Sequence, residues 1–387
     1  MKIDALRIPL AEALPTALAL LERLVNIDSP SDHPDGVAAV LSLLAEPAGQ
    51  LGGELEWRDE GGQRHLRATF HGGARRVGLL GHADTVFPLG TAEFRPFRTA
   101  DHLAYGPGVA DMKGGLVLAL VAIERLLALE GPRPTVELVV VGDEESRLVP
   151  PPFMDVLGQT DACLVLEAGG RDGHFVLGRK TGAWVRLVSQ GRAAHSGTEP
   201  ERGSSAILAL CREVLRVAEL DGTHPGLTVS AGKLQGGSMT NVVPERAEAA
   251  LDIRSLEPAH LDEALQQAAA FDSHRGVRLS MEIDGRWPPM DPGPSSRALA
   301  STYEALARDA GVPTSAELRG GMSDGCWVAA AGVPTLDGLG PVGGFDHGPD
   351  EFIDLASFGD RAALLVGLLV AIEEHGIQSP GRNGDHA

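Results

Sequence analysis

The stretch Val139-Val140-Val141-Gly142-Asp143-Glu144-Glu145-Ser146 decides how the rest of the chain is interpreted. Its first part is a β-branched apolar run, which is typical of a buried strand. Three consecutive acids follow directly. Because ligands of open α/β sheets bind at the carboxyl ends of strands, these carboxylates are predicted to lie at the bottom of a cleft. Neighbouring buried carboxylates repel one another unless a cation neutralises them, and a solvated acidic turn is the simpler alternative.

Segments with helical and strand-like patterns alternate along most of the chain. The predicted helices cover residues 11–25, 34–49 and 116–129, and the predicted strands cover 76–80, 136–141, 163–166 and 333–336. This alternation predicts an α/β fold with a mostly parallel sheet and helices on both faces.

The middle of the chain follows a different order. It reads as strand 183–190, helix 202–219, strands 226–233 and 246–254, helix 258–271 and strand 277–284. This βαββαβ order is typical of a ferredoxin-like domain. Glycines at 178–182 and prolines at 288–294 are suited to domain joins. We therefore expect an inserted domain over 182–293 and a main domain built from 1–181 and 294–387.

The chain's size and charge restrict the function classes. A length of 387 residues favours two domains, and a net charge of −20 argues against nucleic-acid and anionic-membrane partners. Three scattered cysteines form no disulfide framework, so we expect a reducing compartment, by default the cytoplasm. Residues Met1–Arg7 lack the layout of a signal peptide. No window reaches about 18 uninterrupted apolar residues, so no membrane span is predicted.

Two imidazoles and several carboxylates follow predicted strand ends or lie on a glycine-rich loop. They are His82, Asp84, Asp111, Asp143, Glu144, Glu145, Glu167 and His347. A set of imidazole and carboxylate ligands suits zinc, with cobalt or manganese as alternatives. Two metals need one shared carboxylate, and a further carboxylate must stay free to handle a water.

Each of these residues alone has a simpler interpretation. Asp111 could cap the following helix, Glu167 could form an ordinary ion pair, and His347 could be a loop histidine. Asp143 is interpreted as a turn residue and not as a ligand. Asp84, however, can hydrogen-bond the far nitrogen of the nearby imidazole and fix its tautomer, as carboxylates behind metal ligands do. One shared site explains all of these residues together.

Four strings then make a family resemblance specific. They are Gly81-His82-Ala83-Asp84-Thr85-Val86, Gly106-Pro107-Gly108-Val109-Ala110-Asp111-Met112-Lys113-Gly114-Gly115, Asp143-Glu144-Glu145 and Ala194-His195-Ser196-Gly197. In this order, and over nearly its whole length, the chain resembles the dinuclear-zinc amidohydrolases. These include acetylornithine deacetylase, succinyl-diaminopimelate desuccinylase, aminoacylase and glutamate carboxypeptidase. The resemblance includes the inserted domain and implies that it is a lid and dimerisation domain, with a homodimer as the assembly.

The resemblance implies a centre of two Zn²⁺ ions, with Co²⁺ or Mn²⁺ as alternatives. Asp111 would bridge the two metals. His82 and Glu167 would complete one metal site, and Glu145 and His347 would complete the other.

The resemblance also implies roles next to the metals. Glu144 would be the general base for the attacking water and would later deliver its proton to the leaving amine, which agrees with general acid–base chemistry. Asp84 would orient His82. The Asp111–Met112 peptide bond is expected to be cis, as it is in relatives.

Substrate residues are implied in the same way. His195, in the inserted domain, would stabilise the oxyanion in the other subunit's active site. Asn241 and Arg254 match substrate-binding positions, and an arginine at that position could hold a carboxylate in bidentate fashion. An ordinary salt bridge is the alternative for Arg254, and a polar turn is the alternative for His195. Gly321, in a glycine-rich segment, would lie beside the substrate carboxylate.

The chain departs from the family pattern in two places. After the acid triplet it reads Ser146-Arg147-Leu148-Val149-Pro150-Pro151-Pro152, where relatives usually carry glycine and small residues. In the segment Gly320-Gly321-Met322-Ser323-Asp324, Met322 replaces a usual glycine or threonine. The first departure flanks the base and leaves the substrate preference open there, and Met322 is expected to narrow the pocket.

These features predict metal-dependent hydrolysis of an amide next to a free carboxylate. A carboxypeptidase that releases a glutamate-like C-terminal residue is favoured, because residues 320–347 look most like those of glutamate carboxypeptidases. An N-acyl-amino-acid deacylase is the alternative with the same mechanism. A non-catalytic binding protein on the same fold would have lost the base, and Glu144 is present. A phosphoesterase would need a phosphate cradle, which the sequence lacks.

Overall fold

The computed structural model describes residues 10–377. The expectation about a signal peptide concerns residues that lie outside this range. The chain divides into two units. The large unit comprises Met1–Gly178, Met290–Arg319 and Ser323–Ala387, and the small unit comprises Arg179–Pro289 and Gly320–Met322. The predicted joins at 182 and 293 lie close to this division. The sequence pattern did not indicate that residues 320–322 group with the small unit.

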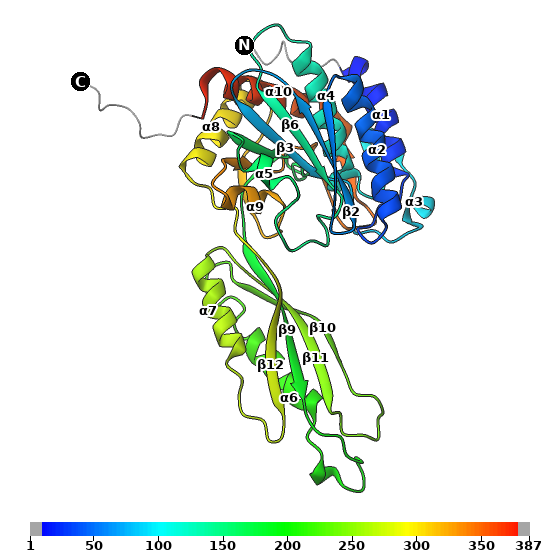
Figure 1. Ribbon diagram of the computed structural model, residues 1–387, viewed down its shortest axis with the longest axis vertical. Helices are drawn as coiled ribbons and strands as arrows, with labels where there is room; N and C mark the ends of the chain where they lie inside the picture. Colours follow the sequence, from blue (N-terminus) through cyan, green and yellow to red (C-terminus); the bar gives the residue numbers. More distant parts are fainter. Residues whose placement is uncertain (1–9, 378–387) are drawn as a thin grey trace, which may run out of the picture. The chain divides into compact units, whose positions relative to one another are not determined.

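A six-stranded sheet forms the centre of the large unit (Figure 1). Its strands are β1 (Glu54–Glu60), β2 (Gln63–Phe70), β3 (Arg76–His82), β6 (Thr135–Val141), β7 (Ala162–Val165) and β14 (Thr335–Leu336), in the order β1-β2-β6-β3-β7-β14. The four strands from β6 to β14 are parallel. The predicted mostly parallel sheet is therefore confirmed. The antiparallel hairpin β1–β2 extends it beside β6.

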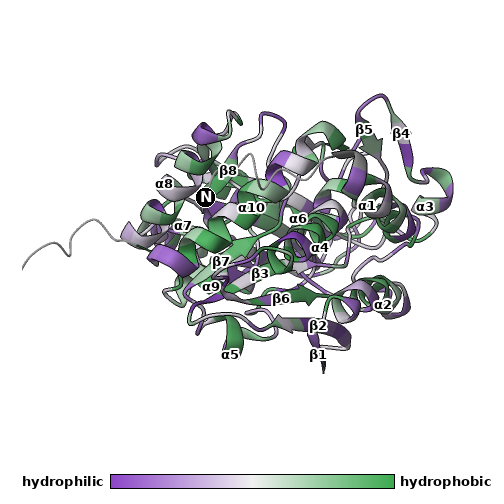
Figure 2. Cartoon of the chain, turned by 90° about the horizontal axis from the view of Figure 1, so that it is seen from above, coloured by the Kyte–Doolittle hydropathy of each residue, from purple (hydrophilic) through white to green (hydrophobic). Residues whose placement is uncertain are grey.

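Helices cover both faces of this sheet, as predicted. One face carries α1 (Leu10–Val25), α2 (Pro34–Gln50), α4 (Gly114–Leu127), α8 (Pro294–Asp309) and α10 (Leu355–His375), and the other carries the short α5 (Met154–Leu157) and α9 (Gly325–Ala330). Strand β6 shows the reason, because successive side chains of a strand point to opposite faces. Leu138 and Val140 pack with the first group of helices, and Val139 and Val141 pack with the second. Figure 2 accordingly shows β6 and α4 mostly in the hydrophobic colour.

Within the described residues, α10 is the helix that is long and apolar enough to cross a membrane by length and composition. Of its most apolar window, 72% is buried inside the protein. Its buried Arg361 donates hydrogen bonds to the carbonyls of Gly340 at 2.8 Å and Gly173 at 3.2 Å. A helix that is covered by its own protein on most sides behaves as a core helix.

A small antiparallel sheet joins two distant segments of the large unit. Its order is β15 (Gly343–Gly344), β16 (Phe352–Asp354), β5 (Leu103–Tyr105) and β4 (Arg98–Ala100). The loop between β15 and β16 carries His347, and the loop after β5 leads to the helical turn Val109–Lys113. Pairing of β16 with β5 therefore brings these two loops together. A further short pair joins β8 (Phe175–Arg179) to β13 (Ala316–Arg319).

The small unit has the predicted element order. Its elements are β9 (Thr181–Gln190), α6 (Ala206–Ala218), β10 (Thr228–Gly236), β11 (Arg246–Ser255), α7 (Pro258–Ala269) and β12 (Arg278–Trp287). The antiparallel sheet has the order β10-β11-β9-β12, which is that of a ferredoxin-like unit. Alternate residues of β11, such as Leu251 and Ile253, are buried with Leu210 of α6 and Leu261 of α7. The two helices therefore cover one face of the sheet.

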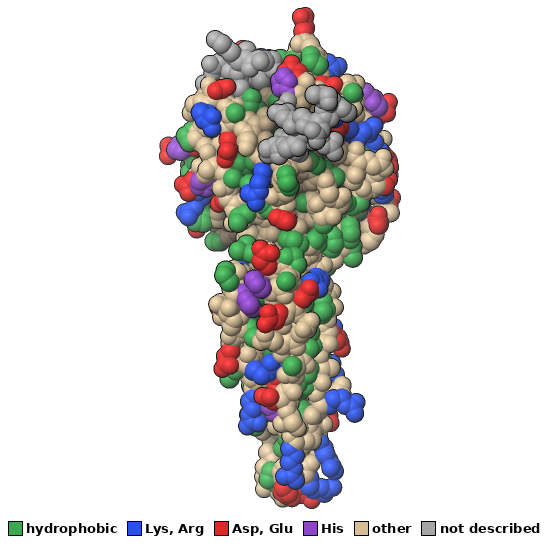
Figure 3. All heavy atoms as spheres, turned by 90° about the vertical axis from the view of Figure 1, so that its left-hand side faces the viewer, with side chains coloured by type: hydrophobic (Ala, Val, Ile, Leu, Met, Phe, Trp, Pro, Cys, Tyr) green, Lys and Arg blue, Asp and Glu red, His purple; other side chains and the backbone are tan. Residues whose placement is uncertain are grey.

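Charged side chains are mixed on the surface. On the face of the large unit that Figure 3 shows, Lys and Arg side chains are scattered among Asp and Glu. Attraction of an anionic polymer needs a continuous basic surface. The face that Figure 3 shows carries no continuous basic surface of this kind.

Candidate metal centre and substrate residues

Parallel strands deliver most of the candidate ligands to one edge of the large sheet. His82 is the last residue of β3 and pairs in register with Val141, the last residue of β6. The acid triplet therefore begins beside His82. Glu167 follows the end of the neighbouring strand β7. These carboxyl ends lie at the same edge because the strands are parallel.

Asp111 lies between two histidines. Its Oδ1 is 2.9 Å from Nε2 of His82, and its Oδ2 is 3.0 Å from Nε2 of His347. Each carboxylate oxygen therefore faces a different imidazole. This is the arrangement that a bridging carboxylate needs.

Two groups of three potential ligands share Asp111. Its partners in the first group are His82 and Glu167, and in the second they are Glu145 and His347, with all ligand atoms of a group within 4.8 Å of one another. The Oε1 atoms of Glu167 and Glu145 are each 3.5 Å from the imidazole of their own group. The structure thus brings together the five residues that the resemblance implies as ligands. The Asp111–Met112 peptide bond is cis, as expected.

The His82 ring is oriented from behind. Its Nδ1 lies 3.0 Å from the backbone carbonyl of Asp84 and 3.3 Å from the Asp84 carboxylate. Since a carbonyl only accepts hydrogen bonds, Nδ1 carries a proton, and this contact directs Nε2 at the ligand group. The contact with the Asp84 carboxylate is the one predicted for this residue, and the contact with its main chain is shorter.

The carboxylate of Asp84 also holds the acid triplet. It is fully buried and accepts hydrogen bonds from the backbone N–H groups of Glu144 and Glu145, both at 3.1 Å. It also accepts one from the Ser31 hydroxyl at 2.6 Å. At the start of the triplet, the N–H of Gly142 donates to Nδ1 of buried His65 at 3.1 Å. The base and the ligand beside it are therefore fixed through their main chain.

Glu351 was not predicted from the sequence, yet it holds the loop that carries Asp111. Its buried carboxylate accepts hydrogen bonds from the N–H groups of Gly108 at 3.0 Å, Ala110 at 2.8 Å and Asp111 at 3.0 Å. Three such bonds hold the glycine-rich loop that presents the central aspartate. An acid shortly after His347 was the available signal, but nothing in its spacing pointed to a main-chain partner.

The contacts around Asp111 shift the pKa values of all three partners. Burial alone raises the pKa of Asp111, but hydrogen bonds from His347 and His82 bring it far below its ordinary value. Hydrogen bonds to Asp111 and Glu145 raise the pKa of His347 to about 11. For His82, burial lowers the pKa, yet the carboxylates of Asp111, Asp84 and Glu167 raise it well above its ordinary value.

The remaining carboxylates are pushed toward their neutral forms. Burial raises the pKa of Glu144 well above its ordinary value, and nearby acids add to this shift. Burial and the charge of Asp111 raise the pKa of Glu167 to about 8. Burial also raises the pKa of Glu145. A cluster of this kind is stabilised in its charged form by cations.

The donor set fits a metal pair. Glu145 Oε1 is buried, and its contact with Nε2 of His347 is long, at 3.5 Å, as expected of an oxygen whose partner is an ion. Two imidazole nitrogens and three carboxylates are the mixed nitrogen and oxygen ligands that zinc accepts. His347 is the most exposed member, with 54% of its side chain accessible, so a small substrate can reach this side of the cluster.

The small unit places two of the predicted substrate residues on adjoining segments. His195 and Val242 form a bridge between backbones, and the N–H of Ser196 donates to the carbonyl of Asn241 at 3.1 Å. Both His195 and Asn241 are exposed. The Nδ1 of His195 accepts hydrogen bonds from the N–H groups of Gly197 and Thr198 at 3.1 and 3.2 Å, so its Nε2 carries the proton and is a free donor.

Arg254 is already engaged. Its guanidinium pairs with Asp252, with Nη2 2.7 Å from Oδ2, and Nη1 donates to the Gly320 carbonyl at 2.9 Å. The guanidinium also lies 5.3 Å from the centre of the Trp287 ring. Arg254 therefore forms the salt bridge that was the alternative to a substrate contact. A substrate carboxylate would have to share the guanidinium with Asp252. Gly321 is held by a hydrogen bond from Arg179 to its carbonyl at 3.1 Å.

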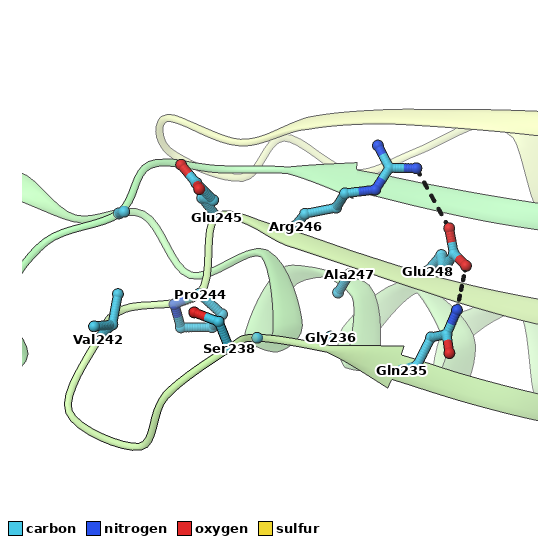
Figure 4. A pocket seen from close by; sticks show the side chains of 11 residues that line it. Gln235, Gly236, Ser238, Val242, Pro244, Glu245, Arg246, Ala247 and Glu248 are labelled. Carbon is cyan, nitrogen blue, oxygen red and sulfur yellow. Dashed lines mark hydrogen bonds and ion pairs between the residues drawn. The ribbon is translucent and has the colours of Figure 1, made fainter.

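A cavity of about 390 Å³ lies beside the same loop of the small unit. It is lined by the ends of β10 and β11 and the residues between them (Figure 4). Glu248 accepts hydrogen bonds there from Gln235 and from Arg246, the latter at 3.4 Å. Since these polar side chains are already paired, the cavity shows no converging groups of the kind found around Asp111.

Comparisons with known proteins agree with this geometry. The chain is 26% identical over 373 residues to carboxypeptidase G2 from a Pseudomonas species, covering 92% of this chain and 89% of that protein. It is 31% identical over 368 residues to a succinyl-diaminopimelate desuccinylase from Paracoccus denitrificans, covering 87% of this chain and 93% of that protein. Both alignments span nearly the whole chain.

The fold and the family match in the same way. A solved M20 family metallo-carboxypeptidase from Sulfolobus solfataricus has the same fold, with a TM-score of 0.70, 18% identity, and coverage of 91% of this chain and 98% of that one. Residues 78–371 match Peptidase family M20/M25/M40. The chain therefore belongs to Peptidase family M20/M25/M40 and is a metal-dependent hydrolase.

Proposed function

We propose that this hydrolase cleaves an amide or peptide bond next to a free carboxylate and releases a glutamate-like C-terminal residue. The observation that carries the proposal is the position of Asp111, whose two carboxylate oxygens face two different histidines in two ligand groups. We infer two zinc ions there, with cobalt or manganese as alternatives. When bound, such ions polarise the scissile carbonyl and acidify the attacking water.

Glu144 is the proposed general base. Its backbone is fixed by Asp84, and burial raises its pKa. Of the two acids of the triplet that belong to neither ligand group, Asp143 is ion-paired with Arg147, which leaves Glu144. A carboxylate with a raised pKa takes a proton from water more readily than an ordinary one, and it can later give that proton to the leaving amine. Asp84 keeps Nε2 of His82 directed at the cluster and keeps Glu144 in place.

The small unit is the proposed source of substrate recognition. The proton on Nε2 of His195 makes that atom a donor for an oxyanion, and this tautomer supports the predicted role. Asn241, Arg254 and Gly321 are the proposed contacts to the substrate and its carboxylate. We also infer a homodimer through the small unit, with His195 acting in the partner subunit's active site. The three free cysteines favour a reducing compartment such as the cytoplasm.

Deacylation of N-acyl amino acids is the second candidate function. The relative at 31% identity is a succinyl-diaminopimelate desuccinylase, whereas carboxypeptidase G2 is at 26%. Both reactions break an amide next to a carboxylate by the same chemistry. They differ in which side of the bond the protein binds.

A substrate panel tests the proposal. The protein is stripped with a chelator, reconstituted with zinc or cobalt, and assayed against N-acetyl, N-benzoyl and N-succinyl amino acids and against dipeptides ending in glutamate. The carboxypeptidase proposal expects the highest kcat/KM with glutamate on the amine side and tolerance of the acyl group. A preference set by the acyl group would favour the deacylase instead. Full activity after chelation would contradict both.

A further inference from the structure

The loop after the acid triplet carries an arginine whose side chain is almost fully buried. Only 7% of the Arg147 side chain is exposed, although its neighbours Ser146 and Val149 are exposed. A guanidinium keeps its charge at any ordinary pH, and a buried charge destabilises the fold unless it is paired. The partners of Arg147 therefore indicate what it does.

Arg147 connects two largely shielded carboxylates from distant parts of the chain. Its Nη2 donates to both oxygens of Asp324, and its Nη1 donates to Oδ1 of Asp143. Its Nε donates to the Val149 carbonyl at 3.1 Å, which closes the loop on itself. The side chains of Asp324 and Asp143 are 6% and 13% exposed. All three polar positions of the guanidinium are thus satisfied, in a network shielded from water.

The base lies between this network and Asp84. On one side, the carboxylate of Asp84 holds the N–H groups of Glu144 and Glu145. On the other, the carbonyl of Asp143 accepts the N–H groups of Ser146 at 3.3 Å and Arg147 at 3.0 Å, so the loop turns back at once. Glu144 is therefore held at both ends of a short tight turn.

Asp324 connects this loop to a second feature of the site. It is the N-cap residue of α9 and comes shortly after Gly320–Met322, the residues that group with the small unit. Ser323, beside it, donates a hydrogen bond to buried Asp337 at 2.6 Å. The arginine thus anchors the base loop to the segment in which the chain returns to the large unit.

We propose that Arg147 is a positioning residue, which fixes the carboxylate of Glu144 by joining Asp143 to Asp324. The inference rests on the proposed function, because it takes Glu144 as the base. Without the guanidinium, two buried carboxylates beside the base would repel each other and the loop would lose its anchor to α9. Misplacement of a base by a small distance lowers turnover more than it lowers substrate binding.

The test is a double-mutant cycle on the zinc-loaded protein, with the fastest substrate of the panel. We expect Arg147→Met to lower kcat about 30-fold while KM stays within about threefold and the zinc content is unchanged. Asp324→Asn should give a similar loss, and the double variant should lose no more than either single variant. Arg147→Lys should recover part of the turnover. The control Arg64→Met removes an arginine whose ion pair with Asp59 is largely exposed, and it should not change kcat.

Each outcome decides between the roles. Equal losses in kcat and zinc content, or a rise in KM alone, would show that Arg147 does not position the base. Additive losses in the double variant would show that Arg147 and Asp324 act independently of each other. If Arg147→Met fails to fold, the lysine and asparagine variants carry the test. Glu144→Gln in the same assay separates this inference from the proposed function, because an active Glu144→Gln protein overturns the base assignment itself. An inactive one beside unchanged Arg147 variants overturns only the role of Arg147.

Discussion

The metal centre of the large unit and the substrate residues of the small unit differ in how firmly they are held. Around Asp111, the side chains of His82, Glu145 and Glu167 are at most 13% exposed, and hydrogen bonds hold the main chain of Glu144 and of the glycine-rich loop. In the small unit, His195 and Asn241 are exposed, and Arg254 is held by an acid two residues away. Groups that carry out a reaction must be fixed before the substrate arrives, whereas recognition groups can adjust.

This difference predicts two kinds of kinetic effect. Changes in the large unit should act on kcat or on metal content, because they alter the geometry of the reacting atoms. Changes in the small unit that affect recognition should act on KM, with His195 as the exception because an oxyanion donor acts on the transition state.

The largest effect is expected for Glu144→Gln. Glutamine keeps the shape and the backbone bonds to Asp84 but cannot take a proton, so kcat should fall about 1,000-fold or more. Zinc content and the melting temperature should stay as in the unchanged protein. Steady-state kinetics with metal analysis on the same sample checks this. Unchanged turnover would show that another group accepts the proton.

The next largest effect on kcat is expected for His195→Ala. His195→Ala removes a proposed oxyanion donor, so kcat should fall about 100- to 1,000-fold while zinc content is unchanged. Arg202→Ala is the matched control, since Arg202 lies on the same exposed segment and pairs with Glu199. Normal turnover in His195→Ala would reduce this histidine to a residue of a polar turn.

Much of the fold was predictable because its apolar periods are simple. The run at 139–141 and the helical spacing over 116–129 each describe one buried face, and both elements formed close to the predicted residues. Strand β1 was not predicted, since Glu54-Leu55-Glu56-Trp57-Arg58-Asp59-Glu60 is mostly charged and exposed. It is a strand because β2 pairs with its main chain along its whole length. Tertiary pairing of this kind leaves little trace in composition.

The site likewise has residues that the sequence predicted and residues that it did not. Ligand types and strand ends were sufficient to single out His82, Glu145 and Glu167, because strand ends meet at one edge. Glu351 and His65 were missed, since both act through backbone N–H groups, and any residue type supplies those. Arg147 stood out only as a departure from the family pattern. A side chain whose partner is main chain can be found only once the chain's path is known.

The metal centre also predicts how zinc affinity depends on pH. Contacts with Asp111 and Glu145 raise the pKa of His347 to about 11, so in the metal-free protein this imidazole is protonated below that pH. Zinc binds the neutral imidazole, and binding must therefore release at least one proton. Apparent zinc affinity should rise about 100-fold from pH 6 to pH 8, or tenfold for each pH unit.

Competition with a chelator of known affinity measures this slope. The variant His347→Ala supplies the control, since removing the imidazole should flatten the slope of the metal site that Glu145 and Asp111 complete. A zinc affinity that does not change with pH would show that the imidazoles are already neutral. The charge balance around Asp111 would then differ from the one that its hydrogen bonds indicate.

The smallest effect is expected for a change of Arg254, a proposed recognition residue of the small unit. Arg254→Lys keeps the charge but loses the planar pair of donors, so a substrate carboxylate shared with Asp252 is bound less well. KM should rise about tenfold, while kcat changes by less than about threefold. Arg186→Lys is the matched control, because Arg186 lies in the same sheet and pairs with Asp284 and Glu282 on β12. A loss confined to kcat would instead place Arg254 among the groups that act on the reacting atoms. An unchanged KM would leave its bond to Asp252 as an ordinary salt bridge, and carboxylate recognition would then have to come from the segment of Gly321 or from the large unit.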